Sequence, residues 1–93
     1  MREKIIEQKL ALAVKALGGI PVKIMTCNIN GMPDRLILLP CGRVAFAELK
    51  APGKPLRPLQ LRRKHQIEAL GFRVFVIDHP DQIGGVLDGI QTS

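Results

Sequence analysis

Two carboxylates and a lysine mark the ends of two apolar runs in the middle of the chain. Asp34 opens the run "DRLILLP" (34–40), while Glu48 and Lys50 close the run "RVAFAELK" (43–50). The short connection "PCG", which contains a glycine, is typical of a β-hairpin. An antiparallel hairpin places the start of one strand beside the end of the next, so we expect Asp34 to approach Glu48. Side chains alternate along a strand, and Glu48 and Lys50 therefore share a face.

These three residue types can do chemistry together. Two carboxylates held close repel each other, and a divalent cation relieves that repulsion. A lysine two residues further on adds a charge that can polarise a phosphate or a water molecule. The spacing therefore predicts a metal site with a lysine beside it. The alternative is that all three are ordinary solvated strand ends.

A third acid comes from an expected helix over residues 2–17, which ends at Gly18-Gly19. Its apolar stripe comprises Ile6, Leu10, Ala13 and Leu17. Glu7 lies at the edge of this stripe, about 100° around the helix from Ile6. Glu3 lies one turn further out. We expect Glu7 to face the sheet end because the packed part of the helix holds it, with Glu3 as the alternative.

A basic cluster follows the two apolar runs. The loop "APGKPLRP" (51–58) contains three prolines, and a helix is expected over about 58–70, with Leu59, Gln66 and Leu70 as its stripe and Arg63 inside it. The cluster comprises Lys54, Arg57, Arg62, Arg63 and Lys64. A phosphodiester substrate needs such cations beside a metal site. For Arg63, snorkelling from the core edge is the alternative, and for the others a solvated face.

The pattern predicts an α/β fold. After the first helix come strands over 20–27, 34–40 and 43–50, the helix over 58–70, and a buried strand over 72–78. Residues 79–90 can form a last helix, weakened by glycines. Short connections predict an antiparallel meander, and the helix between the third and fourth strands allows a right-handed parallel crossover. The unbroken apolar runs suggest that both sheet faces are covered, at least in the middle.

Composition restricts the class of protein. At 93 residues the chain is expected to be one domain (1–93), and 46% hydrophobic residues exclude a disordered tail. Fourteen Lys and Arg against eight acids give a net charge of +6, which favours a polyanionic partner. Cys27 and Cys41 lack metal-ligand spacing and are expected to be reduced, small buried hydrophobes. No signal peptide or membrane span is evident, so a cytoplasmic location is expected, in the bacterial host if a phage encodes the chain.

The segment "GMPDRLILLPCGRVAFAELKAPG", followed by "PLQ", closely resembles the VRR-Nuc (virus-type replication–repair nuclease) family of the PD-(D/E)XK nuclease superfamily. The residues that carry the resemblance are Gly31-Met32-Pro33-Asp34, Glu48-Leu49-Lys50, Gln60 and, in the first helix, Glu7. It extends over nearly the whole chain. It implies a stand-alone family member of the phage or prophage kind, with a restriction-endonuclease-like core in which a small mixed sheet is flanked by helices.

The resemblance also implies roles for these residues. Asp34 and Glu48 would bind Mg²⁺ or Mn²⁺ with the Leu49 backbone carbonyl, and Glu7 would complete the coordination directly or through water. Lys50 would orient the attacking water and stabilise the phosphate. Gln60 would help position Lys50 or the phosphate. No small-molecule cofactor is implied.

The expected function is hydrolysis of DNA phosphodiester bonds by a metal-dependent endonuclease. A homodimer would offer two sites to a Holliday junction, which is the preferred substrate, while cleavage of flaps, nicks or plain duplex stays open. One alternative is a non-catalytic nucleic-acid-binding module that retains the nuclease fold. Another is an interaction subunit of a phage replication complex, which would have no affinity for metal.

Overall fold

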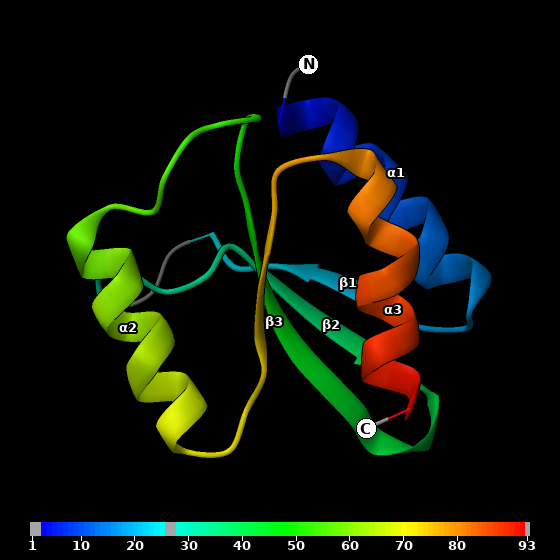
Figure 1. Ribbon diagram of the computed structural model, residues 1–93. Coiled ribbons are helices and arrows are strands. Elements are labelled where there is room, and N and C mark those ends of the chain that lie inside the picture. Colours follow the sequence, from blue (N-terminus) through cyan, green and yellow to red (C-terminus); the bar gives the residue numbers. More distant parts are fainter. Residues whose placement is uncertain (1–2, 26–27, 93) are drawn as a thin grey trace.

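The computed structural model describes residues 3–25 and 28–92, which form a four-stranded sheet with helices on both faces (Figure 1). The helices and strands are α1 (Glu3–Ala16), β1 (Ile20–Lys23), β2 (Arg35–Leu39), β3 (Arg43–Leu49), α2 (Pro58–Ala69), β4 (Val74–Ile77) and α3 (Ile83–Thr92). This order confirms the predicted mixed α/β fold, including the last helix. In the part of the chain described, no helix is long and apolar enough to cross a membrane.

The strands lie in the order β1-β2-β3-β4. The first three pair antiparallel, and β4 pairs parallel to β3 after the crossover through α2, as predicted. β4 is therefore an edge strand. Its Ile77 is fully buried, whereas its Val76 is 37% exposed, so the expectation of a buried strand at 72–78 is only half right. The central strand of the site is β3, with a neighbour on each side.

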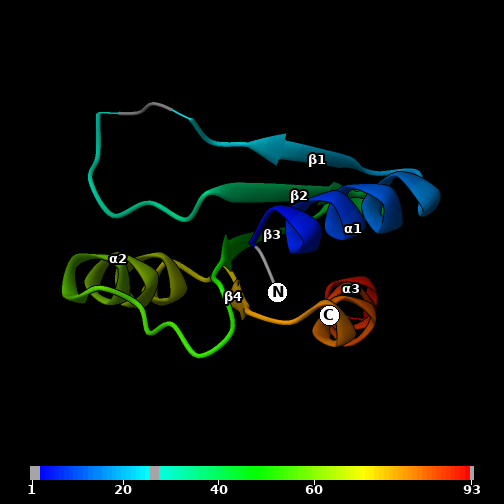
Figure 2. The same ribbon diagram turned by 90° about the horizontal axis from the view of Figure 1, so that it is seen from above.

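The two faces of the sheet are covered unequally. Figure 2 shows α1 and α3 on one face and α2 on the other. The main core lies under α1 and α3, where Ile6, Leu10 and Val14 of α1 pack with alternate residues of β2 and β3. Burial alternates along β2, with Ile37 fully buried and its neighbours only partly so. The middle of the second face is covered, as expected, where Phe46 packs against Phe72, whereas Val44 near the start of β3 is exposed.

The strand β1 is shorter than the predicted range of 20–27. It ends at Lys23, although the Ile24 N–H still donates to the Asp34 carbonyl at 2.9 Å. Pro33, the next residue on the partner side, has no N–H with which to continue the ladder. Cys27 lies outside the described residues. Cys41 is exposed in a turn at a φ of 67°, so the expectation that it is a buried hydrophobe is wrong.

The helix α2 buries a different face from the one predicted. Its buried residues are Gln60 and Ile67, seven positions apart and so on one side of the helix. Leu59 and Leu70 of the expected stripe are exposed. α2 packs against β4 and the loop at Gly31, and its buried side includes an amide where apolar periodicity alone favours leucine.

The glycine of the "GMPD" segment fixes the loop before β2 against α2. Gly31 has a φ of +80°, in the left-handed region that glycine adopts freely. A Cβ atom built there would lie 2.7 Å from the Leu59 carbonyl oxygen. Only glycine therefore allows both the turn and the close approach to α2, and this contact sets where the chain enters β2.

We predict that Gly31→Ala destabilises the protein more than Gly53→Ala. Gly53 has nearly the same φ, +79°, but open space around its Cα, so alanine there should lower the free energy of unfolding by about 1 kcal/mol. At Gly31 the clash adds to that strain, and a loss of about 2–3 kcal/mol is expected. Urea denaturation of both variants measures the difference; equal losses would contradict the packing argument.

Candidate active site

Asp34 and Glu48 meet at one end of the sheet. The β2–β3 register pairs Arg35 with Ala47, so the residue before Arg35 comes opposite Glu48. The Leu49 N–H donates to Asp34 Oδ1 at 3.2 Å and fixes the carboxylate at this end. Glu48, the last residue but one of β3, is only 5% exposed. The structure thus brings the two acids together as the hairpin predicts.

The carboxylate pair lacks sufficient positive charge. Burial, and then the nearby charge of Asp34, raise the pKa of Glu48 from 4.5 to about 7, although Lys50 and Arg57 act in the opposite direction. Burial also raises the pKa of Asp34, against the Leu49 hydrogen bond and the charge of Arg35. Glu48 is therefore buried beside the half-buried Asp34, and the nearby cations offset the raised pKa values only in part, an electrostatic condition that favours binding of a further cation.

Lys50 lies just after β3 and belongs to the same end of the sheet. Its backbone N–H donates to the Ile77 carbonyl of β4 at 2.9 Å, which continues the β3–β4 ladder by one residue. Two positions after Glu48, Lys50 shares that residue's face, and its charge acts on the Glu48 carboxylate. The predicted grouping of Asp34, Glu48 and Lys50 is present.

The two acids of α1 take different positions. Glu7 Oε2 lies 2.8 Å from Arg35 Nη2, and Glu7 Oε1 lies 3.8 Å from Lys23 Nζ. The charge of Glu3, by contrast, raises the pKa of both Asp34 and Glu48. Glu3 is thus the helix acid whose field reaches the pair, while Glu7 is held by cations. Metal coordination by Glu7 stays a prediction.

Sequence reasoning missed Arg35. It is 7% exposed, and its guanidinium contacts both Glu7 and the Asp34 carbonyl. A signal was available: an arginine at an inward position of the run "RLILL" must find an acidic partner, because an unpaired buried charge is costly. The position of Glu7 on the first helix made it a candidate for that partner as well as for a metal ligand.

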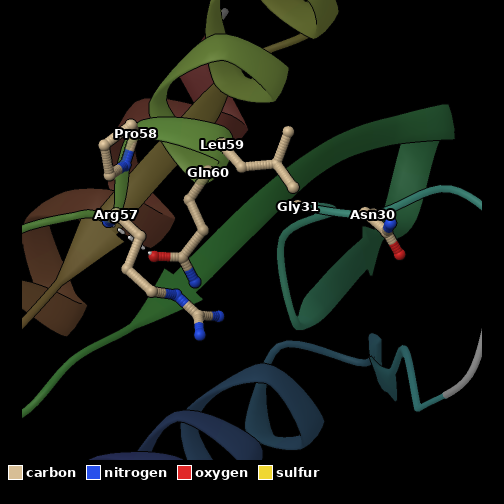
Figure 3. Close-up of a pocket in the computed structure, with 6 residues that line it drawn as sticks. All are labelled: Asn30, Gly31, Arg57, Pro58, Leu59 and Gln60. Carbon is tan, nitrogen blue, oxygen red and sulfur yellow. Dashed lines mark hydrogen bonds between the residues drawn. The ribbon is translucent and has the colours of Figure 1, made fainter.

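The start of α2 adds an amide and an arginine beside this edge. Gln60 is buried, and its Oε1 accepts a hydrogen bond from the Arg57 backbone N–H at 2.9 Å, so it also satisfies the helix N-terminus. Both side chains extend to the same side of the helix start (Figure 3). They line a cavity of about 530 Å³ together with Asn30, Gly31, Pro58 and Leu59. Positioning of Lys50 or a phosphate by Gln60 stays a prediction.

The five basic residues predicted to bind nucleic acid divide into two groups. Arg63 Nε donates to the Asn30 carbonyl at 2.9 Å, and Lys64 pairs with Glu68 at 3.0 Å, so both have structural partners. The other three side chains, those of Lys54, Arg57 and Arg62, are exposed on the loop and the start of α2. The contact of Arg63 ties α2 to the loop that precedes Asp34.

The donor atoms fit a hard divalent cation. Among residues 3–25 and 28–92, no three His, Cys, Asp or Glu side chains converge as a ready-made cluster. Asp34 and Glu48 supply two carboxylates, and the Leu49 carbonyl is the predicted third donor. Mg²⁺ typically binds through one or two carboxylates and completes its octahedron with water and substrate oxygens. The incomplete set is therefore the one expected for such an ion.

We predict that the metal-free protein is more stable at pH 5 than at pH 8. The folded state raises the pKa of Glu48 to about 7, so it binds the proton more tightly than the unfolded chain does. The stabilisation is present below pH 4.5 and is lost as the pH rises through about 7. It should amount to about 2 kcal/mol between the two pH values. Denaturant titrations in EDTA measure it, and Glu48→Gln should flatten the profile; an unchanged profile in that variant would contradict the assignment.

Comparisons with known proteins agree with the resemblance carried by the motifs. No protein-family model matches the chain. The chain is 43% identical over 81 residues to "Putative nuclease p44" of Acyrthosiphon pisum secondary endosymbiont phage 1, a match that covers 87% of each protein. A solved structure described as a VRR_NUC domain has a TM-score of 0.86 and 29% identity, over 92% of this chain and 94% of that one. The chain therefore belongs to the VRR-Nuc family of nucleases and resembles its phage-encoded members.

Proposed function

We propose that this nuclease is a divalent-metal-dependent DNA endonuclease that hydrolyses phosphodiester bonds. The observation that carries the proposal is the buried Glu48 beside the half-buried Asp34, both with a raised pKa, with the charge of Lys50 acting on Glu48. A purely structural sheet end would place such acids in solvent, where their repulsion is screened. A divalent cation between the two acids would relieve both their repulsion and the cost of partial burial.

Asp34, Glu48 and the Leu49 carbonyl would hold Mg²⁺ or Mn²⁺. When bound, the ion would supply positive charge to the scissile phosphate and lower the pKa of a coordinated water. Glu7, whose oxygens face Arg35 and Lys23, would contribute through water or through its cationic partners. The protein side chains fix where that ion and the substrate can sit.

Lys50 would act on the reacting atoms. An ammonium group on the face of Glu48 can orient the attacking water and stabilise the charge that develops on the phosphate oxygens. Gln60, on the neighbouring edge, would hydrogen-bond to the phosphate or to Lys50, and Arg57 would donate to the phosphate. As the water oxygen bonds to phosphorus and its proton passes to solvent, the bond from phosphorus to the 3′ oxygen would break, and that oxygen would take up a proton from water.

The DNA backbone would lie along the basic loop and the start of α2. Three exposed cations lie there, Lys54, Arg57 and Arg62. Of these, Arg57 lines the cavity of about 530 Å³, and its charge acts on the Glu48 carboxylate. Each phosphate contact adds affinity that weakens with salt. The net charge of +6 acts in the same direction by attracting a polyanion from a distance.

The proposed substrate is branched DNA, cut by a homodimer. A two-fold dimer would present two sites to the two symmetric strands of a four-way junction. Exposed apolar side chains support a second subunit: Leu70 is 72% exposed and Phe72 is 48% exposed, next to each other after α2. Covering that surface would also add to the small core of a chain of this size.

We predict metal-dependent, symmetric cleavage of a labelled four-way junction. Purified protein should cut the junction with Mg²⁺ or Mn²⁺ and cut a linear duplex of matched sequence at least tenfold more slowly. Glu48→Gln should lower the rate at least about 100-fold, because it removes a charged ligand without changing the shape of the side chain. The measurement is single-turnover cleavage resolved on a sequencing gel.

The other outcomes separate the parts of this proposal. Equal cleavage of both substrates would keep the metal-dependent chemistry and remove the preference for junctions. Junction binding without cleavage in either metal would contradict the enzyme and favour a non-catalytic nucleic-acid-binding module.

We predict that Lys50→Met does not weaken metal binding, since loss of a nearby positive charge should leave the affinity unchanged or higher. It should lower the cleavage rate about 100-fold, since Lys50 would act on the water and the phosphate. Lys15→Met, which removes an exposed lysine from the last turn of α1, is the matched control and should cleave normally. Metal affinity comes from calorimetry and the rate from the junction assay. A Lys50→Met variant that cuts as fast as Lys15→Met would exclude a catalytic lysine.

A further inference from the structure

Arg35 is a buried cation in an otherwise apolar strand. It opens β2 at a position that faces α1, and only 7% of its surface is exposed. A buried guanidinium is tolerated only when its charge is paired and its N–H groups have acceptors. The contacts of Arg35 therefore indicate its role.

The guanidinium of Arg35 contacts two residues of the proposed site. Nη2 lies 2.8 Å from Glu7 Oε2 on α1, and Nη1 donates to the Asp34 carbonyl at 2.8 Å. Nη1 also lies 3.7 Å from Asp34 Oδ1. A planar guanidinium can serve two acceptors in fixed directions, which a lysine ammonium cannot do with the same precision of geometry.

Asp34 is consequently held from three sides. Its carbonyl accepts hydrogen bonds from the Ile24 N–H at 2.9 Å and from Arg35, and its Oδ1 accepts from the Leu49 N–H at 3.2 Å. The buried ring of Pro33 restricts the backbone just before it. The Ile24 and Leu49 bonds come from the sheet, whereas the Arg35 bond is the one that depends on α1.

Both oxygens of Glu7 face cations: Oε2 faces Arg35, and Oε1 faces Lys23 at 3.8 Å. A carboxylate whose Oε2 is engaged at 2.8 Å by a buried guanidinium balances that buried charge. Glu7 thus contacts Arg35, which in turn contacts Asp34.

We propose that Arg35 is a positioning residue, which couples Glu7 of α1 to the backbone of Asp34 and so holds the Asp34 carboxylate where the divalent cation is bound. The inference rests on the proposed metal site. It assigns Glu7 an indirect role, through Arg35, in place of coordination.

The direction in which metal affinity changes when the Arg35 guanidinium is removed separates a positioning role from a purely electrostatic one. A cation close to a metal site repels the metal, so removing a guanidinium that acts only by its charge should tighten metal binding. Removing a guanidinium that positions a ligand should weaken it. Loss of a group that orients a metal ligand typically lowers metal affinity by about 10-fold to 100-fold.

The experiment is Mn²⁺ titration of the wild-type protein, Arg35→Met, Arg35→Lys, Glu7→Gln and the double variant Glu7→Gln/Arg35→Met, followed by electron paramagnetic resonance. We expect Arg35→Met to bind Mn²⁺ about tenfold more weakly, with partial rescue in Arg35→Lys. Glu7→Gln should weaken binding in the wild-type background and have no further effect in the Arg35→Met background.

Arg73→Met is the matched control. Arg73 also joins two segments, donating to the Gly89 carbonyl at 2.6 Å, but it precedes β4 and lies level with Phe46, away from the carboxylate pair. It should lose stability and keep its Mn²⁺ affinity. If Arg35→Met fails to fold, Glu7→Gln and Arg35→Lys still test the coupling, since each keeps a polar group in the same space.

Unchanged or tighter Mn²⁺ binding in Arg35→Met would overturn the inference. So would a Glu7→Gln effect of equal size in both backgrounds, which would mark Glu7 as a ligand in its own right. Failure of the wild-type protein itself to bind Mn²⁺ is a different result, and it would overturn the proposed metal site.

Discussion

The β2–β3 register is the constraint on which the rest of the site depends. Because Arg35 pairs with Ala47, Asp34 comes opposite Glu48, and the Leu49 N–H can donate to the Asp34 carboxylate. A shift of one residue would turn every side chain of β2 to the other face. Asp34 would then face α1, and Ile37 would leave the core. The same register thus fixes both the apolar core and the charged end.

At that end of the sheet, the carboxylates of Asp34 and Glu48 are partly removed from water, which disfavours their charged forms. Desolvation raises the pKa of both acids, so the folded protein carries an electrostatic strain that the nearby basic residues only partly relieve. Sites that bind substrates or ions commonly reduce stability in this way, because their groups are arranged for a partner that the folded chain alone lacks. The loop that leads into the site is also tightly packed, since Gly31 lies against the Leu59 carbonyl.

Local patterns in the sequence sufficed for the strands, their topology and the meeting of Asp34, Glu48 and Lys50, because alternation and hairpin geometry are local rules. The buried face of α2 could not be predicted in this way. That face is determined by tertiary contacts of α2 with β4 and with the loop at Gly31, whereas the hydrophobic pattern of the helix favours a different face. The partner of Glu7 was missed for a related reason, since helix periodicity gives the direction of a side chain but not the buried arginine that it meets.

The central claim is that Asp34 and Glu48 hold a divalent cation together. The most direct measurement is anomalous diffraction from crystals grown with Mn²⁺, collected near the manganese absorption edge. The account predicts a strong anomalous peak within coordination distance, about 2.0–2.2 Å, of both carboxylates, with the Leu49 carbonyl as a further ligand. A saturated crystal with no peak at this end of the sheet, or with its peak on other residues, would contradict the account.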